Sequence, residues 1–347
     1  MMIRRGARST LALTATAVAA ALTLTACGNG GDQGPDGRLN VVASFYPMEF
    51  LATKIGGEHV KVTGLTAAGV EPHDLELTAK QVGRVQKADA IVYLKGLQPT
   101  VDKAVAGSGA KHKVDATAAV PLEDHHLPEG HAEGDGHDHD GHDDGHHHDE
   151  AAGDPHIWLD PTRYAAVARS VGAEFAQADP EHAEDYRRNT DELVGRLTAL
   201  DQEFKDGLKD APNRTFVTSH AAFGYLAEAY GLTQVSINGV DPESEPTPAR
   251  MADVQKAAKE NGVTTIFFET LASPRLAETV AKDLGLRTAV LDPLEGVKDQ
   301  AEDDYLTVMR QNLTALQTAL GVNANASANA GTGTGPTAAP AATTPTS

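Results

Sequence analysis

The chain is poor in cysteine, aromatic residues and basic residues. Its only cysteine, Cys27, excludes an intrachain disulfide, a four-cysteine zinc site and a Cys-X-X-Cys redox site. Aromatic residues make up 5% of the 347 residues and hydrophobic residues 40%, so a core must be built mainly from aliphatic side chains. The net charge of −20 argues against nucleic acid as a partner, because phosphate binding needs a basic surface. The length suggests about two domains.

The first 26 residues have the pattern of a secretory signal peptide. Arg4, Arg5 and Arg8 precede fourteen residues, 11–24, that carry no charge. Such a run is shorter than the roughly 20 apolar residues that span a bilayer, but it suits the core of a signal peptide. We therefore predict that residues 1–26 are an export signal.

The segment Leu24-Thr25-Ala26-Cys27-Gly28 resembles a bacterial lipoprotein box. The resemblance implies that Cys27 is lipidated and becomes the first residue of the mature protein. The expected location is extracytoplasmic, with a lipid anchor on the outer face of the cytoplasmic membrane. Residues 27–38, rich in Gly and Asp, are predicted to be a flexible tether.

Short apolar runs and helical patterns alternate along the rest of the chain. This alternation predicts an α/β fold, with parallel sheets flanked by helices on both faces. Strands are predicted at residues 39–43, 60–65, 90–94, around Val114, and at 215–218, 234–237, 263–268 and 288–291. Helices are predicted at residues 48–55, 77–88, 222–229, 248–261 (capped by Thr247), 274–284 (capped by Ser273) and 303–320.

A long helix is predicted between the two groups of strands. Asp179 and Pro180 suit a helix start, and apolar positions then recur at steps of three and four as far as Leu208. The helix would have about 30 residues and a length of about 45 Å. We predict a spine at 179–211 joining an N-terminal lobe, 39–178, to a C-terminal lobe, 212–320. Residues 321–347 are expected to be disordered, because uncharged Ala, Thr, Gly, Asn and Pro cannot bury enough surface to fold.

A histidine- and acid-rich loop interrupts the first lobe at residues 123–150. It carries 11 acidic residues and no basic ones. Imidazole favours zinc, copper, nickel and cobalt over calcium and magnesium, and the frequent glycines argue against a rigid site. We therefore predict weak, exchangeable metal sites. The nine histidines are His125, His126, His131, His137, His139, His142, His146, His147 and His148.

Four other residues are candidates for an ordered metal site. His73, His220 and Asp292 each follow a predicted strand, and His156 precedes a predicted helix. Ligands of open α/β sheets bind beyond the carboxyl ends of the strands, so these side chains can converge in a cleft between the lobes. Three imidazoles and one carboxylate form a shell suited to Zn²⁺.

Each of these residues taken alone has a plainer interpretation. A single His after a strand is often a helix cap or a surface residue, and Asp before Pro is a common turn signal. Asp160 is better interpreted as the cap of a helix that starts at Pro161. His59, His112 and His182 lie in polar surroundings, and we expect none of them to bind metal.

Six stretches of the chain form a recognisable set. They are Ser44-Phe45-Tyr46-Pro47, Glu71-Pro72-His73, Asp154-Pro155-His156-Ile157-Trp158-Leu159-Asp160-Pro161, Ser219-His220-Ala221-Ala222-Phe223-Gly224-Tyr225, Ile266-Phe267-Phe268-Glu269 and Leu291-Asp292-Pro293-Leu294. Taken together, they make the chain resemble the cluster A-I solute-binding proteins of ABC metal importers, most closely the ZnuA-type zinc-binding members. The resemblance covers about residues 39–320, and zinc members typically carry an acidic histidine loop where this chain has residues 123–150.

The resemblance implies two α/β lobes joined by a rigid spine helix, with metal bound between them. It assigns ligand roles to His73, His156 and His220, with Asp292 as the fourth ligand and Glu71 or a water as the alternative. Glu269 ends a very apolar predicted strand, and we expect it to orient a ligand histidine, with a helix-capping role ahead of Ser273 as the alternative. Manganese-binding relatives usually have a carboxylate where this chain has His220, so the softer imidazole predicts zinc.

The leading hypothesis is therefore a monomeric zinc-binding lipoprotein that delivers Zn²⁺ to an ABC permease and its ATPase for zinc uptake. One rival is a zinc hydrolase, which would need an open metal position and a general base such as Glu71. The sequence has no His-Glu-X-X-His motif and shows no clear substrate pocket, so we expect no enzyme. The other rival, a surface adhesin, cannot be distinguished from the sequence.

Overall fold

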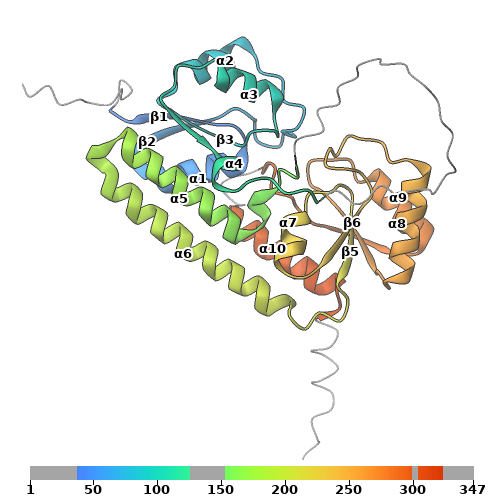
Figure 1. Ribbon diagram of the computed structural model, residues 1–347. Coiled ribbons are helices and arrows are strands. Elements are labelled where there is room, and N and C mark those ends of the chain that lie inside the picture. The colour runs from blue at the N-terminus through green and yellow to red at the C-terminus, as the bar shows by residue number, and fades with distance from the viewer. Residues whose placement is uncertain (1–36, 126–152, 299–303, 323–347) are drawn as a thin grey trace, which may run out of the picture. The chain divides into compact units, whose positions relative to one another are not determined.

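The computed structural model describes residues 37–125, 153–298 and 304–322 (Figure 1). All of them belong to one compact unit, Asp32–Ser347. The predicted signal peptide, Cys27, residues 323–347 of the predicted tail and every loop histidine except His125 lie outside the described residues. Among the helices of the described ranges, none is both long enough and apolar enough to cross a membrane.

The first lobe contains a parallel sheet with the strand order β2-β1-β3-β4. Its four strands match the predicted positions to within a few residues, and Figure 1 shows α2 and α3 on one face of the sheet and α1 and α5 on the other. The elements are β1 (Leu39–Ala43), α1 (Tyr46–Gly56), the short 3₁₀ helix η1 (Gly57–His59), β2 (Val60–Gly64), α2 (Ala79–Gln86), β3 (Ala90–Tyr93), α3 (Pro99–Ala106), β4 (His112–Asp115) and α4 (Ala116–Ala119).

The second lobe repeats this topology, with the parallel order β6-β5-β7-β8. In both sheets the first strand lies between the second and the third, which creates a topological switch point beside it. The fold class predicted from the sequence is therefore confirmed. The elements are β5 (Thr215–Thr218), α7 (Gly224–Ala229), β6 (Thr233–Ser236), α8 (Pro248–Glu260), β7 (Thr265–Phe268), α9 (Arg275–Leu284), β8 (Arg287–Val290) and α10 (Tyr305–Ala319).

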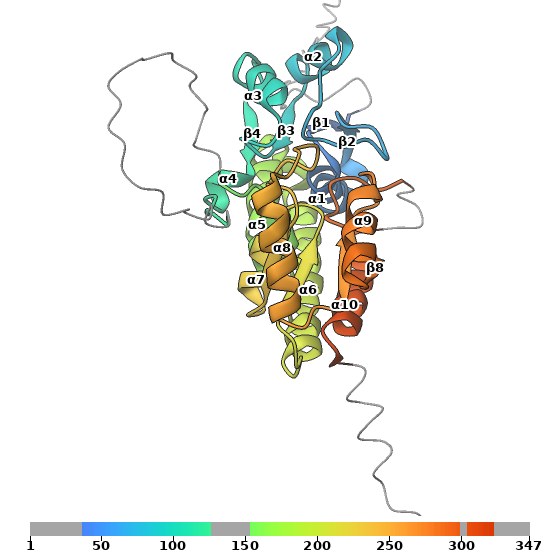
Figure 2. The same cartoon turned by 90° about the vertical axis from the view of Figure 1, so that its right-hand side faces the viewer.

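Alternating side chains of each sheet enter different hydrophobic clusters. Val41 and Ala43 belong to a large central core, whereas Val42 between them packs with residues of α2 and α3. In the second sheet Phe216 enters the same central core, and Val217 packs on the side of α8 and α9. Successive strand residues point to opposite faces, and helices cover both faces here (Figure 2). This explains why the strands have continuous apolar sequences.

The connection between the sheets is helical. It comprises the short 3₁₀ helix η2 (Ile157–Leu159), α5 (Pro161–Ala178), the 3₁₀ helix η3 (Pro180–His182) and α6 (Ala183–Leu208). As predicted, Asp160 caps α5, accepting hydrogen bonds from the backbone of Thr162 and Arg163. The predicted apolar stripe is buried along α6.

Two predicted helix caps lack a side-chain capping bond. Asp179 occupies the cap position before Pro180, where the helical segment starts as predicted, but its carboxylate forms no cap bond and accepts hydrogen bonds from the side chains of His182 and Tyr186. The first turn is the 3₁₀ helix η3, and α6 follows from Ala183. Ser273 does not cap α9 either, since that helix begins one residue after the predicted start and Pro274 occupies the cap position without a side-chain bond.

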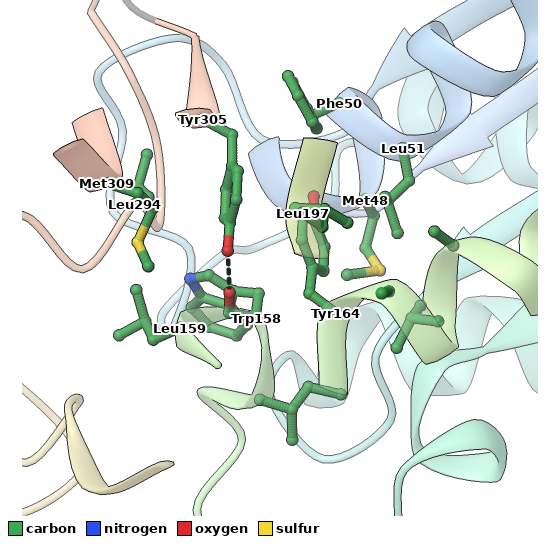
Figure 3. Close-up of a cluster of buried hydrophobic side chains, with 14 of the residues drawn as sticks. Met48, Phe50, Leu51, Trp158, Leu159, Tyr164, Leu197, Leu294, Tyr305 and Met309 are labelled. Atoms are coloured by element: carbon green, nitrogen blue, oxygen red, sulfur yellow. Dashed lines mark hydrogen bonds between the residues drawn. The ribbon is translucent and has the colours of Figure 1, made fainter. Parts of the chain in front are cut away.

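A central core joins the two lobes around Trp158 (Figure 3). The indole of Trp158 is fully buried, and its Nε1 donates a hydrogen bond of 2.7 Å to the carbonyl of Pro293. The hydroxyl of Tyr305, at the start of α10, donates a hydrogen bond of 2.6 Å to the carbonyl of Trp158. The two lobes thus share buried side chains, and η2 is tied to the segment that follows β8.

Helices α5 and α6 pack closely at Gly172, which yields a first prediction. A Cβ added at Gly172 would lie 2.0 Å from Oγ1 and 3.1 Å from Cβ of Thr190 on α6. Gly172→Ala should therefore lower the free energy of unfolding by about 1–3 kcal/mol through overpacking. Urea denaturation of the metal-free protein measures this.

The matched control is Gly195→Ala on the exposed side of α6, where an added Cβ meets no atom within 4 Å. That change should leave stability unaltered or raise it by up to about 1 kcal/mol, because Ala has the higher helix propensity. Equal effects of the two substitutions would show that close packing at Gly172 does not limit stability.

Candidate metal centre

The three histidines predicted as ligands converge on a single carboxylate. The Nε2 atoms of His73, His156 and His220 lie 3.1, 3.0 and 3.3 Å from Oε1 of Glu295. His156, His220 and Glu295 are buried, whereas His73 is partly exposed. One potential ligand atom from each of the four residues lies within 4.8 Å of the others. This set is a candidate metal centre.

The spacing of these atoms fits a tetrahedral zinc ion. Ligand atoms about 2.0–2.1 Å from Zn²⁺ at the corners of a tetrahedron lie about 3.3 Å from one another. The nitrogen–oxygen separations of 3.0 to 3.3 Å are close to that edge. In addition, Nε2 of His220 and Oε2 of Glu295 are buried without a hydrogen-bond partner. Buried polar atoms normally have partners, and a bound cation would supply one.

A carboxylate orients the ring of His156. Oδ1 of Asp154 accepts hydrogen bonds from Nδ1 of His156, at 2.7 Å, and from its backbone nitrogen, at 3.0 Å. When Nδ1 carries the proton, the lone pair of Nε2 faces the centre. The buried helix η2 follows directly, so the position of His156 is set from both sides.

His220 is oriented in the same way by a neighbouring strand. It follows β5, and Glu269 follows β7, the strand that pairs with β5. Oε1 of Glu269 accepts a hydrogen bond of 2.5 Å from Nδ1 of His220 and another from the hydroxyl of Ser219. The contact with His220 is the one expected for Glu269 from the sequence.

Asp292 does not belong to the cluster, which departs from the sequence-based expectation. Its carboxylate accepts hydrogen bonds from the hydroxyl of Thr270, at 2.7 Å, and from the backbone nitrogen of Leu294, at 2.8 Å. Its backbone forms two further bonds with the side chain of Asn312. Asp292 therefore holds the turn that follows β8, and the next carboxylate along the chain, Glu295, enters the cluster.

Glu295 was not among the ligands predicted from the sequence. Leu294 has a φ of 58°, a left-handed conformation that branched side chains rarely adopt. This conformation and the bond from Trp158 to Pro293 shape the turn that carries Glu295. The sequence does show a glutamate between the end of an apolar strand and Gly296, which makes it a candidate ligand. It does not show toward which side the turn directs that side chain.

Glu71, the alternative fourth ligand, also lies outside the four-residue cluster. Its Oε1 is 4.0 Å from Nε2 of His73 and accepts a hydrogen bond of 2.9 Å from the backbone nitrogen of His73. Burial raises the pKa of Glu71, although its hydrogen bond to His73 opposes the rise. Its contact therefore shapes the loop that carries His73.

The buried histidines and carboxylates of the centre shift one another's pKa values. Burial by itself lowers the pKa of His220, but Glu269 and Glu295 raise it to about 10. Burial also lowers the pKa of His156, but the carboxylates of Asp154 and Glu295 outweigh this effect and raise it. Burial would raise the pKa of Glu295, yet the three histidines hold it well below its usual range. Without a metal the cluster therefore retains protons, which a cation must displace.

The loops that carry His73 and Glu295 meet next to the centre. The backbone nitrogen of Gly69 donates a hydrogen bond of 3.2 Å to the carbonyl of Val297. A Cβ at Gly296 would lie 3.3 Å from the carbonyl oxygen of Val70, so the small residue permits the close approach. The two lobes thus contact each other through backbone atoms beside the cluster.

The histidines that were not expected to bind metal pair with carboxylates outside the centre. His59 Nε2 lies 2.8 Å from Asp185, and His112 Nδ1 lies 2.8 Å from Glu174. His182 bonds to Asp179 as described above. The described loop histidine, His125, bonds through Nδ1 to Oδ2 of Asp154 at 3.0 Å.

The fold and the cluster define a class of protein, namely a two-lobed α/β protein with a buried His₃-carboxylate site between its lobes. Residues 41–319 match the family described as zinc-uptake complex component A, periplasmic (ZnuA). The chain belongs to this family, which confirms the resemblance seen in the sequence.

Curated relatives agree with this assignment. Zinc-binding protein AdcA of Streptococcus pyogenes serotype M3 is 40% identical over 306 residues, covering 83% of this chain and 57% of the relative. The chain thus spans little more than half of that protein. High-affinity zinc uptake system protein ZnuA of Bacillus subtilis is 38% identical over 311 residues, covering 87% of this chain and 95% of the relative.

Solved structures give the same picture. The Zn(II)-bound ZnuA-like domain of Streptococcus pneumoniae AdcA matches with a TM-score of 0.66 and 33% identity, over 82% of this chain and 99% of that one. The laminin-binding protein Lmb of Streptococcus agalactiae, described as having adhesin and metal-transporting activity, matches with a TM-score of 0.69 and 28% identity, over 81% and 99%.

Proposed function

We propose that this protein captures Zn²⁺ outside the cytoplasm with His73, His156, His220 and Glu295, and delivers it to an ABC permease for zinc uptake. The observation that carries the proposal is the convergence of three imidazole nitrogens on one carboxylate oxygen. Family membership and the zinc-binding relatives support the identity of the metal.

The donor set favours zinc on chemical grounds. Three imidazoles and a single carboxylate suit Zn²⁺, whereas harder cations prefer sites richer in oxygen. The shell is also already complete with four protein ligands. A catalytic zinc keeps a position for water or substrate, so this set suits binding and release better than hydrolysis.

The test combines metal titration with zinc uptake. Untagged protein should bind one tight equivalent of Zn²⁺ in competition with a chelator, and His220→Ala should lose it. In the producing organism, a strain lacking the gene should grow poorly in zinc-depleted medium and recover with the wild-type gene but not with His220→Ala. The control His112→Ala, which alters a histidine paired with Glu174, should behave as wild type in both assays. Tight binding by His220→Ala would contradict the proposal.

Glu269 is proposed to position His220. Glu269→Gln replaces the charged acceptor of the Nδ1 hydrogen, so the imidazole becomes a weaker and less constrained ligand. Loss of such a supporting contact typically weakens metal binding by about 10–100-fold. Chelator competition measures the change. The control Glu278→Gln, on the exposed side of α9, should have no effect. Equal zinc affinities of the two variants would exclude the positioning role.

The remaining assignments complete the proposal. Cys27 would anchor the mature chain to the outer face of the membrane, and a Streptococcus pneumoniae relative, 38% identical over 303 residues, is named a zinc-binding lipoprotein. Residues 27–38 would be the tether, and the spine at 179–211 would separate lobes 39–178 and 212–320. The protein would act as a monomer with a permease and its ATPase. The histidines of residues 125–150 would concentrate zinc near the cleft.

A further inference from the structure

A second group of metal-ligating side chains lies at the start of the histidine-rich loop. Nε2 of His125 faces two carboxylates, with Oε2 of Glu228 at 3.6 Å and Oε2 of Glu123 at 4.0 Å. The three potential ligand atoms lie within 4.8 Å of one another. Glu123 and His125 follow α4 of the first lobe, whereas Glu228 belongs to α7 of the second. The group therefore spans the lobes.

The imidazole of His125 is held in an orientation suited to a ligand. Its Nδ1 bonds to Oδ2 of Asp154 at 3.0 Å, and its ring packs edge-on against Tyr225 at a centroid distance of 4.3 Å. A proton on Nδ1 leaves the Nε2 lone pair directed at the two glutamates. A metal-binding histidine usually donates its other ring hydrogen to a carboxylate in this way.

The base of the loop is also fixed. The backbone nitrogen of Asp154 donates a hydrogen bond of 2.8 Å to the carbonyl of Glu123. The hydroxyl of Tyr225 accepts from the nitrogen of Glu123, at 2.7 Å, and donates to the carbonyl of Asp154, at 2.9 Å. A cavity of about 270 Å³ with His125 and Glu228 in its wall adjoins the group. The three side chains are therefore brought together by a defined local structure.

Arg163 determines how strongly this group can bind a cation. Its guanidinium pairs with Oε1 of Glu123 and, at 2.7 Å, with Oε2 of Glu228. It therefore neutralises part of the negative charge, while Oε2 of Glu123 still faces His125. The glutamate side chains are about half exposed. A bound cation would compete with Arg163 and with water, which makes the site weak and readily exchangeable.

We propose that His125, Glu123 and Glu228 form a second site for a divalent transition-metal ion such as Zn²⁺, at the surface and bridging the two lobes. Asp154 connects it to the buried centre, because its two carboxylate oxygens hold His125 and His156. A metal ion bound to His125 would be linked through the carboxylate of Asp154 to His156, a ligand of the buried centre. The second site would hold an ion before it enters the buried centre.

The test uses the full chain with the other eight loop histidines changed to Ser, titrated with Zn²⁺ and with Co²⁺. The expected result is one tight equivalent and one weaker equivalent. His125→Ala should abolish the weaker one and change the tight dissociation constant less than threefold, which also shows that the variant is folded. Glu228→Gln, at an exposed position, should weaken the second site at least tenfold. The control His112→Ala should retain both equivalents.

The proposal is wrong if the eight-serine protein binds a single equivalent, or if the weaker equivalent persists in His125→Ala. If His125→Ala loses both equivalents, the effect of Glu228→Gln on the weaker equivalent becomes the test. Unchanged binding of the weaker equivalent by Glu228→Gln would then overturn the proposal. The result is separable from that for the buried centre, because failure of the proposed zinc-capture function would remove the tight equivalent and leave the weaker one.

Discussion

Replacing Glu295 with Gln should weaken zinc binding by about 100-fold or more. The substitution keeps the shape of the side chain but removes the negative charge at the point where three imidazole nitrogens meet. Changes in supporting contacts cost about 10–100-fold in metal affinity, and loss of a charged direct ligand should cost at least the upper end of that range. Chelator competition with the wild-type and variant proteins measures the difference.

Asp292→Asn provides the matched control for this experiment. Asp292 is the next carboxylate toward the N-terminus in the same turn, and its oxygens accept hydrogen bonds from Thr270 and Leu294. An Asn side chain can still accept one of these bonds, and the Thr270 hydroxyl can rotate to accept from its amide. We expect less than a tenfold loss of zinc affinity. If Asp292→Asn weakened binding as much as Glu295→Gln, or if Glu295→Gln had no effect, the assignment of Glu295 as a ligand would be wrong.

The apparent zinc affinity should fall steeply as the pH is lowered. In the metal-free protein, Glu269 and Glu295 overcome the effect of burial and raise the pKa of His220 to about 10. The pKa of His156 is also raised. At neutral pH His220 therefore carries a proton that Zn²⁺ must displace, so a raised pKa weakens binding below that pKa. Each displaced proton lowers the affinity about tenfold per pH unit.

Between pH 7.5 and 5.5, release of one to two protons predicts an affinity loss of about 10² to 10⁴-fold. Titration calorimetry in buffers of different ionisation enthalpy counts the protons directly, and chelator competition at several pH values gives the affinity. Titrations of the chelator alone correct for its own protonation. Binding that is independent of pH and releases no proton would show that the metal-free cluster is already deprotonated.

Much of the architecture could be predicted from local sequence. The apolar runs that became strands have side chains on both faces of a covered sheet, as Val41 and Val42 illustrate. The stripe along α6 follows from the helical repeat. The capping bond at a helix start could not be predicted where the side chain in the cap position bonds to another side chain instead of the helix backbone. Asp179 bonds to Tyr186, seven residues along the chain, and this contact is not visible in a local pattern.

In the candidate site, too, some residues could be predicted from local sequence and others depend on distant contacts. His156 and His220 could be named from the sequence because His156 precedes a predicted helix, His220 follows a predicted strand, and both lie in stretches that resemble those of ZnuA-type proteins. The fourth member of the cluster could not be named, because Asp292 and Glu295 occupy one irregular turn. Thr270 and Asn312, distant in sequence, bind Asp292 and fix the direction of that turn.

Local periodicity predicts the two groups of strands and the long helix between them, and the three imidazoles could be named because their stretches also resemble those of ZnuA-type proteins. The choice of the carboxylate that meets the imidazoles, and the position of Glu228 of α7 opposite His125, follow from the folded chain alone. A side chain on a turn takes its direction from packing against distant segments. Those contacts exist only after both lobes have folded around their common core.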